Sequence, residues 1–153
     1  MAGTATETLL ITREFHAPIQ QVFNAWTQAE VIAQWFGPEG FSVINAQIDL
    51  HVGGKYDLTI ASPDKETVRH FGEYVEISPP YNLIFTWELE GQSCDGSEGQ
   101  HASTLVTLVF KERANNTQLT LTHEKLPDQA AYDGHEFGWL SCLDSLATRL
   151  NTV

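Results

Sequence analysis

Polar and apolar side chains alternate with a period of two through the middle of the chain, from Phe41 to Glu124. This alternation predicts β-strands that have one face in a core and the other in water. Pairs of turn-forming residues interrupt it at Gly53-Gly54, Pro79-Pro80 and Asn115-Asn116, and such breaks are typical of the turns between antiparallel strands. The pattern predicts six strands in this region, at residues 41–49, 55–60, 67–78, 82–89, 103–112 and 117–124.

Before this region the chain carries one strand and two short helices. Residues 8–15 are rich in β-branched and apolar side chains, which predicts a strand. Pro18 suits a first helical turn. Apolar residues then recur at the three- and four-residue spacing of an amphipathic helix: Ile19, Val22, Phe23 and Trp26. A second short helix is predicted at 29–35, ended by Gly37-Pro38.

The last segment, residues 128–150, returns to helical spacing and predicts one long helix. Its apolar stripe contains Tyr132, Trp139, Leu143, Leu146 and Leu150, widened by Phe137, Leu140 and Ala147. A seven-stranded antiparallel sheet must cover one face, and only this helix is long enough to do so. The predicted fold is α+β, in the order β-α-α-β6-α, with a curved antiparallel sheet around the C-terminal helix and an apolar cavity between them.

Alternation also predicts which side chains face the helix. The inner sets are Leu83, Phe85, Trp87 and Leu89; Tyr56, Leu58 and Ile60; Val106, Leu108 and Phe110; and Leu119, Leu121 and His123. In the strand at 67–78 the set Phe71, Val75 and Ile77 carries Glu73 inward with it. An inward carboxylate is the least usual of these predictions.

Size and charge limit the functional classes. The chain has 153 residues, 42% of them hydrophobic, which suits one domain at 8–153 after a flexible N-terminus at 1–7. A net charge of −12 and scattered basic residues argue against nucleic-acid binding. The first residues have no signal-peptide pattern, and no apolar run is long enough to insert in a membrane. Cys94 and Cys142 define no disulfide framework, so we expect a cytoplasmic protein.

Several fragments, in this order and spacing, resemble the family of activator of heat-shock-chaperone ATPase homologues in the START-like, or SRPBCC, superfamily. The resemblance covers nearly the whole chain. The fragments are REFHAP at 13–18, VFNAWT at 22–27, QWFGP at 34–38, Asp49 with GGKY at 53–56, GEYVEISPP at 72–80, LIFTW at 83–87, LTLTHE at 119–124 and Gly138-Trp139. One position departs from the family: His51 stands where an arginine is usual, so the salt bridge of that arginine is not carried over.

The resemblance implies the helix-grip fold and a cavity that takes a small hydrophobic molecule. The family name implies a second role, as a protein-interaction module that contacts a chaperone in the stress response. Some superfamily members catalyse cyclisation or hydrolysis in the same cavity, so an enzyme is a third alternative. A fold by itself does not choose among these three functions.

The predicted cavity lining is mostly aromatic, as ligand pockets usually are. The alternative for each ring is packing in an ordinary core. The predicted ligand-binding residues are Trp35, Phe36, Tyr56, Phe71, Glu73, Phe85, Trp87, His123, Trp139, Cys142 and Leu143. Entry is predicted beside residues 35–38 and the loop at 91–100, which is rich in glycine and serine.

Glu73 and His123 are the candidates for proton transfer if the protein is an enzyme. A hydrogen-bonded core histidine is the alternative for His123, and no catalytic triad motif is present. A metal site is a further alternative, with His123, His135 and Cys142 as its ligands. Zinc sites normally have ligands at short local spacing, and this spacing is missing here. We therefore expect neither a metal nor a cofactor and assign no catalytic residue.

Overall fold

The computed structural model describes residues 7–37, 40–91 and 103–151. Its elements follow the predicted order. Most of their boundaries lie within two residues of the predicted ones. They are β1 (Glu7–Phe15), α1 (Ile19–Thr27), α2 (Ala29–Ile32), β2 (Ser42–Ile48), β3 (Lys55–Ala61), β4 (Thr67–Ser78), β5 (Asn82–Gly91), β6 (Thr104–Arg113), β7 (Asn116–Leu126) and α3 (Gln129–Asn151). The predicted flexible N-terminus lies outside the described residues except for Glu7, which begins β1.

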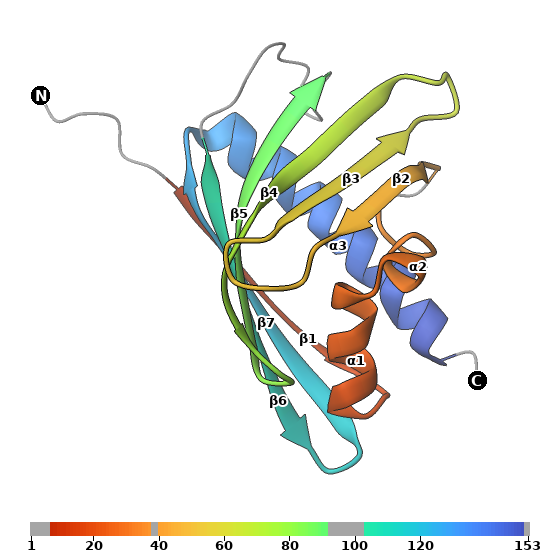
Figure 1. Cartoon of the computed structure of the whole chain (residues 1–153), viewed down its shortest axis with the longest axis vertical. Coiled ribbons are helices and arrows are strands. Elements are labelled where there is room, and N and C mark those ends of the chain that lie inside the picture. Colours follow the sequence, from red (N-terminus) through yellow and green to blue (C-terminus); the bar gives the residue numbers. More distant parts are fainter. Residues whose placement is uncertain (1–6, 38–39, 92–102, 152–153) are drawn as a thin grey trace, which may run out of the picture.

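The strands form one seven-stranded sheet in the order β1-β7-β6-β5-β4-β3-β2, and every neighbouring pair is antiparallel. The sheet is strongly twisted and curved, and α3 crosses its concave side while α1 and α2 lie toward one end (Figure 1). The α+β helix-grip architecture predicted from the sequence is confirmed. This arrangement places the pocket-forming residues between the curved sheet and the helices.

The helices bury the faces that their spacing predicts, with one correction in α2 and one in α3. The α-helical part of α2 is a single turn, shorter than the predicted 29–35, and turns carry the chain on to Gly37. Gly37 has φ +109°, which glycine adopts without strain. In α3, Phe137 and Leu140 are 69% and 44% exposed because they lie off the stripe that packs on the sheet, so their predicted place in the core is wrong.

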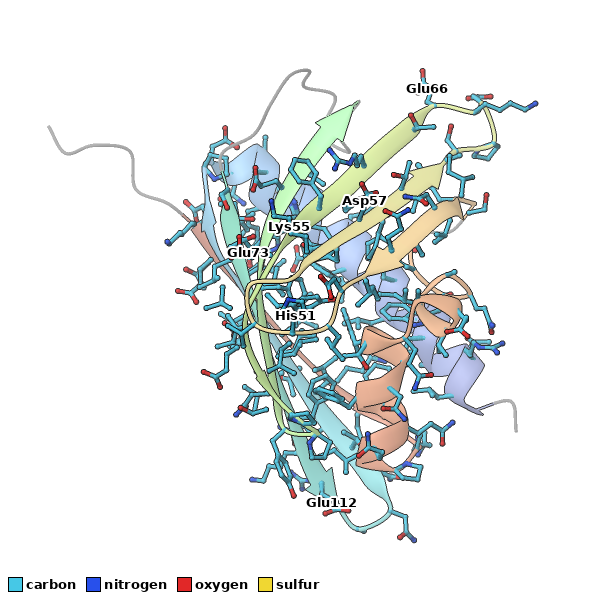
Figure 2. The ribbon with its side chains drawn as sticks, viewed as in Figure 1. His51, Lys55, Asp57, Glu66, Glu73 and Glu112 are labelled. Atoms are coloured by element: carbon cyan, nitrogen blue, oxygen red, sulfur yellow. The ribbon has the colours of Figure 1, made fainter. Side chains whose placement is uncertain are left out.

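The predicted inner sets of β3, β5, β6 and β7 are all buried, but the prediction for β4 is out of phase. Residues paired across antiparallel strands share a face, and Leu58 pairs with His70. The inward residues of β4 are therefore Val68, His70, Gly72 and Tyr74. Glu73 is exposed, opposite Lys55 of β3 (Figure 2). Its predicted inward position is wrong.

Two features of β4 explain the error. His70 and Gly72 occupy inward positions without looking apolar in sequence, whereas Phe71 stacks its ring under the Arg69 guanidinium on the other face, 4.2 Å from the ring centroid. The register also shifts between Tyr74 and Glu76, so that Ile77 returns to the inner face opposite Leu83. A bulge of this kind reverses the alternation within one strand.

Gly72 lies where the backbone of β4 comes close to that of β5. A Cβ atom at this position would lie 2.1 Å from the carbonyl oxygen of Thr86, so no side chain fits without a backbone shift. Tyr56, the β3 partner of Gly72, donates its hydroxyl hydrogen to the same carbonyl at 2.6 Å. The three strands are thus tied together at the centre of the aromatic inner face.

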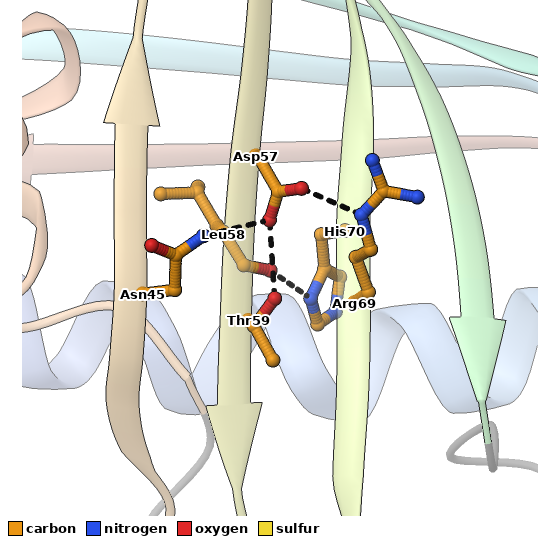
Figure 3. Close-up of polar contacts among 6 residues, drawn as sticks. All are labelled: Asn45, Asp57, Leu58, Thr59, Arg69 and His70. Carbon is orange, nitrogen blue, oxygen red and sulfur yellow. Dashed lines mark hydrogen bonds and ion pairs between the residues drawn. The ribbon is translucent and has the colours of Figure 1, made fainter.

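The outer face of β2–β4 carries a polar cluster formed by Asn45, Asp57, Thr59 and Arg69, on the side of the sheet away from α3 (Figure 3). Asp57 accepts hydrogen bonds from Arg69 Nε at 2.6 Å, Thr59 Oγ1 at 3.1 Å and Asn45 Nδ2 at 3.3 Å. Partial burial alone would raise the pKa of Asp57, but these hydrogen bonds and the Arg69 charge outweigh it and lower the pKa. Asp57 is therefore held ionised.

Candidate functional site

A small apolar pocket lies between the inner face of β2–β5 and the α1–α2 end of the molecule. Among the described residues, none that lines this pocket has a carboxylate, ammonium or guanidinium group. The lining residues are Trp26 of α1, Ile32 of α2, Phe36 after it, Ile48 of β2, Tyr56 and Leu58 of β3, Tyr74 of β4, and Leu83, Phe85 and Trp87 of β5. Six of these ten side chains are aromatic, namely Trp26, Phe36, Tyr56, Tyr74, Phe85 and Trp87.

The pocket volume is about 20 Å³, which is room for about one water molecule. Rings of the pocket wall pack edge to face. Tyr56 and Phe85 have centroids 5.4 Å apart at 81°, and Phe36 and Trp87 lie 6.1 Å apart at 61°. A molecule larger than water therefore needs the wall to move.

The structure divides the predicted site residues into three groups. Phe36, Tyr56, Phe85 and Trp87 line the pocket. A second group is buried in the core without lining it: Trp35, His123, Trp139, Cys142 and Leu143. Phe71 and Glu73 lie on the opposite face of β4, so their predicted place in the cavity is wrong.

Sequence reasoning missed six lining residues: Trp26, Ile32, Ile48, Leu58, Tyr74 and Leu83. Trp26, Leu58 and Leu83 carried a usable signal, since all three belong to the apolar sets predicted from spacing and alternation. Tyr74 was lost through the phase error in β4. Ile48 lies on the edge strand β2, whose place beside the pocket depends on the sheet order.

The indole N–H groups of the four tryptophans are not equally satisfied. Trp35 donates to the carbonyl of Ala25 at 3.0 Å. Trp87 donates to Nε2 of His135 at 3.2 Å, and Trp139 donates to Nδ1 of His123 at 3.1 Å. The Nε1 of Trp26 is buried and has no hydrogen-bond partner among the described residues.

His123 is the centre of a complete hydrogen-bond chain under α3. An indole nitrogen only donates, so His123 Nδ1 accepts from Trp139 and its Nε2–H donates to Thr104 Oγ1 at 2.7 Å. The Thr104 hydroxyl donates in turn to the carbonyl of Trp87 at 2.9 Å. Burial, with a smaller effect of nearby His135, lowers the pKa of His123 to about 2. His123 is thus a neutral core residue.

Two further histidines surround Trp87. His135 Nε2 accepts from the Trp87 indole, so its Nδ1–H donates to the carbonyl of Ala131 at 2.8 Å. His70 Nδ1 lies 3.2 Å from the carbonyl of Leu58 and must be the donor there. Burial outweighs this hydrogen bond and lowers the pKa of His70 to about 4.

These positions bear on two chemical arrangements considered from sequence, an acid-base pair and a metal site. Glu73 is exposed on the outer face while His123 is 0% exposed, so the two do not form an acid-base pair across the pocket. Within residues 7–37, 40–91 and 103–151, no three His, Cys, Asp or Glu side chains are grouped so as to hold a metal ion. Cys142 Sγ instead accepts a hydrogen bond from the backbone N–H of Gly37 at 3.2 Å.

The two phenols of the pocket wall stay protonated at neutral pH. Burial, with smaller effects of Tyr74 and Glu88, raises the pKa of Tyr56 well above its ordinary value. Burial likewise raises the pKa of Tyr74. The wall therefore carries no charge at neutral pH.

The predicted entrance differs from the structure at one of its two parts. Trp35 and Phe36 are 2% and 5% exposed, so they do not form an open rim. Pro38 and the loop from 92 to 100 lie outside the described residues. Among the described residues, no helix combines the length and apolar composition needed to cross a membrane.

A family model described as Activator of Hsp90 ATPase homolog 1-like protein matches residues 16–151. The solved structure of a protein from Chromobacterium violaceum is similar to this one, with 22% sequence identity and a TM-score of 0.84. The aligned region covers 95% of this chain and 98% of that one. An AHSA1 protein of Silicibacter pomeroyi is 25% identical with a TM-score of 0.82, covering 94% and 97%. A Rhizobium leguminosarum protein is 25% identical with a TM-score of 0.78, covering 99% and 98%.

No curated protein matches the sequence. The structural likenesses agree with the START-like fold suggested by the sequence fragments. Because the family match extends over most of the chain, the protein belongs to the family of Activator of Hsp90 ATPase homolog 1-like proteins.

Proposed function

We propose that this protein binds a small hydrophobic molecule in the pocket between β2–β5 and the α1–α2 end. The observation that carries the proposal is the composition of the pocket wall, where ten side chains present apolar and aromatic surface and no ionised group. Apolar walls with few polar groups are typical of small-molecule sites. The START-like architecture is in keeping with this role.

Ligand entry requires the wall to open, and the α2–β2 side is the place where we expect this. α2 is a single turn of four residues, and β2 is an edge strand held by β3 alone. Short elements at an edge open at a lower free-energy cost than central strands. Ile32, Phe36 and Ile48, which line this side, would move away from the fixed rings of β3 and β5.

Binding is tested with N-phenyl-1-naphthylamine, a neutral apolar fluorophore whose emission rises in apolar surroundings. We expect about one site per chain and quenching of tryptophan fluorescence, because Trp26 and Trp87 line the pocket. Leu83→Trp should reduce affinity at least about tenfold, since it adds an indole where there is room for about one water. Ile48→Phe is a milder filling variant in case Leu83→Trp does not fold.

The matched control is Phe137→Ser, which removes the most exposed large apolar side chain of α3 and leaves the pocket intact. Its dye affinity should equal that of the parent. Loss of binding in Phe137→Ser together with unchanged binding in folded filling variants would place the dye on the surface and refute the proposal. Absence of any binding to the parent protein would also refute it.

The family description favours a second candidate, contact with an Hsp90-type chaperone. In that case the protein would stimulate the chaperone's ATPase in a purified mixture. No stimulation and no complex at micromolar concentrations would eliminate this candidate. The ligand-binding proposal does not depend on the outcome.

A further inference from the structure

The polar character of the ligand can be inferred from one residue that lines the pocket, Trp26, and from its buried indole N–H. The Trp26 side chain is 3% exposed, and its N–H has no acceptor among the described residues. An unmet buried donor lowers the stability of the fold, and such groups are rare in folded proteins. The other three indoles in this chain all have protein acceptors.

The surroundings of Trp26 explain why the fold itself supplies no acceptor. Trp35 and Trp139 pack against the Trp26 ring with centroids 4.8 Å and 5.9 Å away. The face of a neighbouring ring is at best a weak acceptor.

A second polar group of the pocket wall is the hydroxyl of Tyr74. The Tyr74 hydroxyl makes no hydrogen bond to any described residue, although the backbone of Tyr74 is bonded to the 53–54 turn. The hydroxyl can donate or accept. The pocket therefore presents an unmet donor on α1 and an adaptable group on β4, within an otherwise apolar wall.

Charge selects among molecules that carry an acceptor. A carboxylate in this pocket would have no cationic side chain to pair with on the wall, and removing it from water without a partner is costly. The net charge of −12 adds a long-range penalty for an anion. A neutral acceptor such as a ketone, ester or ether oxygen meets the Trp26 N–H without these costs.

We propose that the pocket selects neutral, largely apolar molecules that place one hydrogen-bond acceptor on Trp26 Nε1. This inference rests on the proposed ligand-binding function and narrows it to a chemical class. The apolar part of the ligand packs against Phe85 and Trp87 across the pocket. The acceptor oxygen of the ligand favours the bound state, because the Trp26 N–H is without a hydrogen bond when the ligand leaves.

The test compares three probes of similar shape. Cumene has no hydrogen-bond acceptor, acetophenone has a carbonyl oxygen where cumene has a methyl group, and benzoate is an anion. Binding is followed by ¹H–¹⁵N NMR of the four indole groups, with the Trp26 signal assigned by its disappearance in Trp26→Phe. After correction for transfer from water, acetophenone should bind about 3- to 10-fold more tightly than cumene, as one hydrogen bond allows. It should move the Trp26 N–H signal downfield, and benzoate should bind most weakly.

Trp26→Phe should abolish the preference for acetophenone over cumene, and a thermal melt checks that the variant is folded. Equal binding of cumene and acetophenone, no downfield shift at Trp26, or tightest binding by benzoate would overturn the inference while leaving a hydrophobic site in place. Tightest binding by N-methylpyridinium, added as a cationic probe, would overturn it in favour of an aromatic cation site. Failure of every probe to bind would overturn the ligand-binding function itself.

Discussion

The layer beneath α3 and the pocket beside α1 both contain tryptophan side chains, but the indole N–H groups are hydrogen-bonded differently in the two regions. Under α3, Trp139 and Trp87 each donate to a histidine, and the chain continues through Thr104 to a backbone carbonyl. Beside α1, the Trp26 N–H has no acceptor among the described residues. The complete hydrogen bonding of the first region ties α3 to the sheet, whereas the unmet donor of the second region is the basis of the proposed ligand site.

The same contrast separates residues that looked alike in sequence. His123 is an inward histidine near aromatic rings, which is also the description of a catalytic base. Both of its nitrogens are engaged within the fold, so it has no lone pair to offer a substrate. The pocket instead contains phenol and indole groups, which suit binding more than proton transfer.

The largest effect on this comparison is expected from His123→Ala. The substitution leaves a cavity and removes the acceptor of the Trp139 N–H, so the free energy of unfolding should fall by about 3–5 kcal/mol. Urea denaturation of the parent and the variant measures the change. A loss below about 1 kcal/mol would mean that the hydrogen-bond chain under α3 does not lock the helix to the sheet.

Acidification should weaken the fold through the buried histidines. Their folded pKa values, about 4 for His70 and about 2 for His123, lie below the ordinary value of 6.5, so the unfolded chain binds more protons in this range. Stability is therefore greatest above pH 6.5 and falls as pH drops toward 4. Each histidine should cost about 2 kcal/mol at pH 5.

Denaturation at pH 7.5 and pH 5 tests this dependence, with His70→Phe as the matched variant. In His70→Phe, the slope of the unfolding free energy against pH should fall by about 1.4 kcal/mol per pH unit, which is the contribution of one proton. The contribution of His123 to this slope should remain. An unchanged slope in His70→Phe would show that another group causes the acid sensitivity.

A matched pair of indole deletions isolates the hydrogen bond itself. Trp139→Phe and Trp26→Phe remove similar ring area from buried positions, but only the first breaks a hydrogen bond within the protein. Trp139→Phe should be the more destabilising by about 1–2 kcal/mol, measured by urea denaturation of both variants. Equal losses would remove the distinction between a satisfied indole and an unmet one.

The smallest effect is expected on the outer face, at Arg69→Met. The guanidinium bonds Asp57 but its side chain is 43% exposed, so the ion pair is screened by water and the free energy of unfolding should change by less than about 1 kcal/mol. Probe affinity should not change, because the cluster lies on the opposite side of the sheet from the pocket. A change in probe binding would show that the outer cluster shapes the pocket.

The sequence by itself determined the order of elements and most of the inner face. Alternation identified Leu58, Phe85 and Leu108 as inward residues because antiparallel strands with one dry face impose a period of two. The three- and four-residue spacing likewise located α1 and the buried stripe of α3. These signals are local, since each depends only on how neighbouring residues share a core.

Only the tertiary structure decided the phase of β4, the lining of the pocket and the roles of the polar groups. The register between β3 and β4 turned Glu73 outward and His70 inward, and no pattern within β4 contains that register. Whether a buried tryptophan has a hydrogen-bond acceptor depends on residues far away in the chain. His123 is the acceptor for Trp139, whereas no described residue accepts from Trp26. Hydrogen bonds need both partners within about 3.5 Å, and only the folded chain brings distant partners together at that distance.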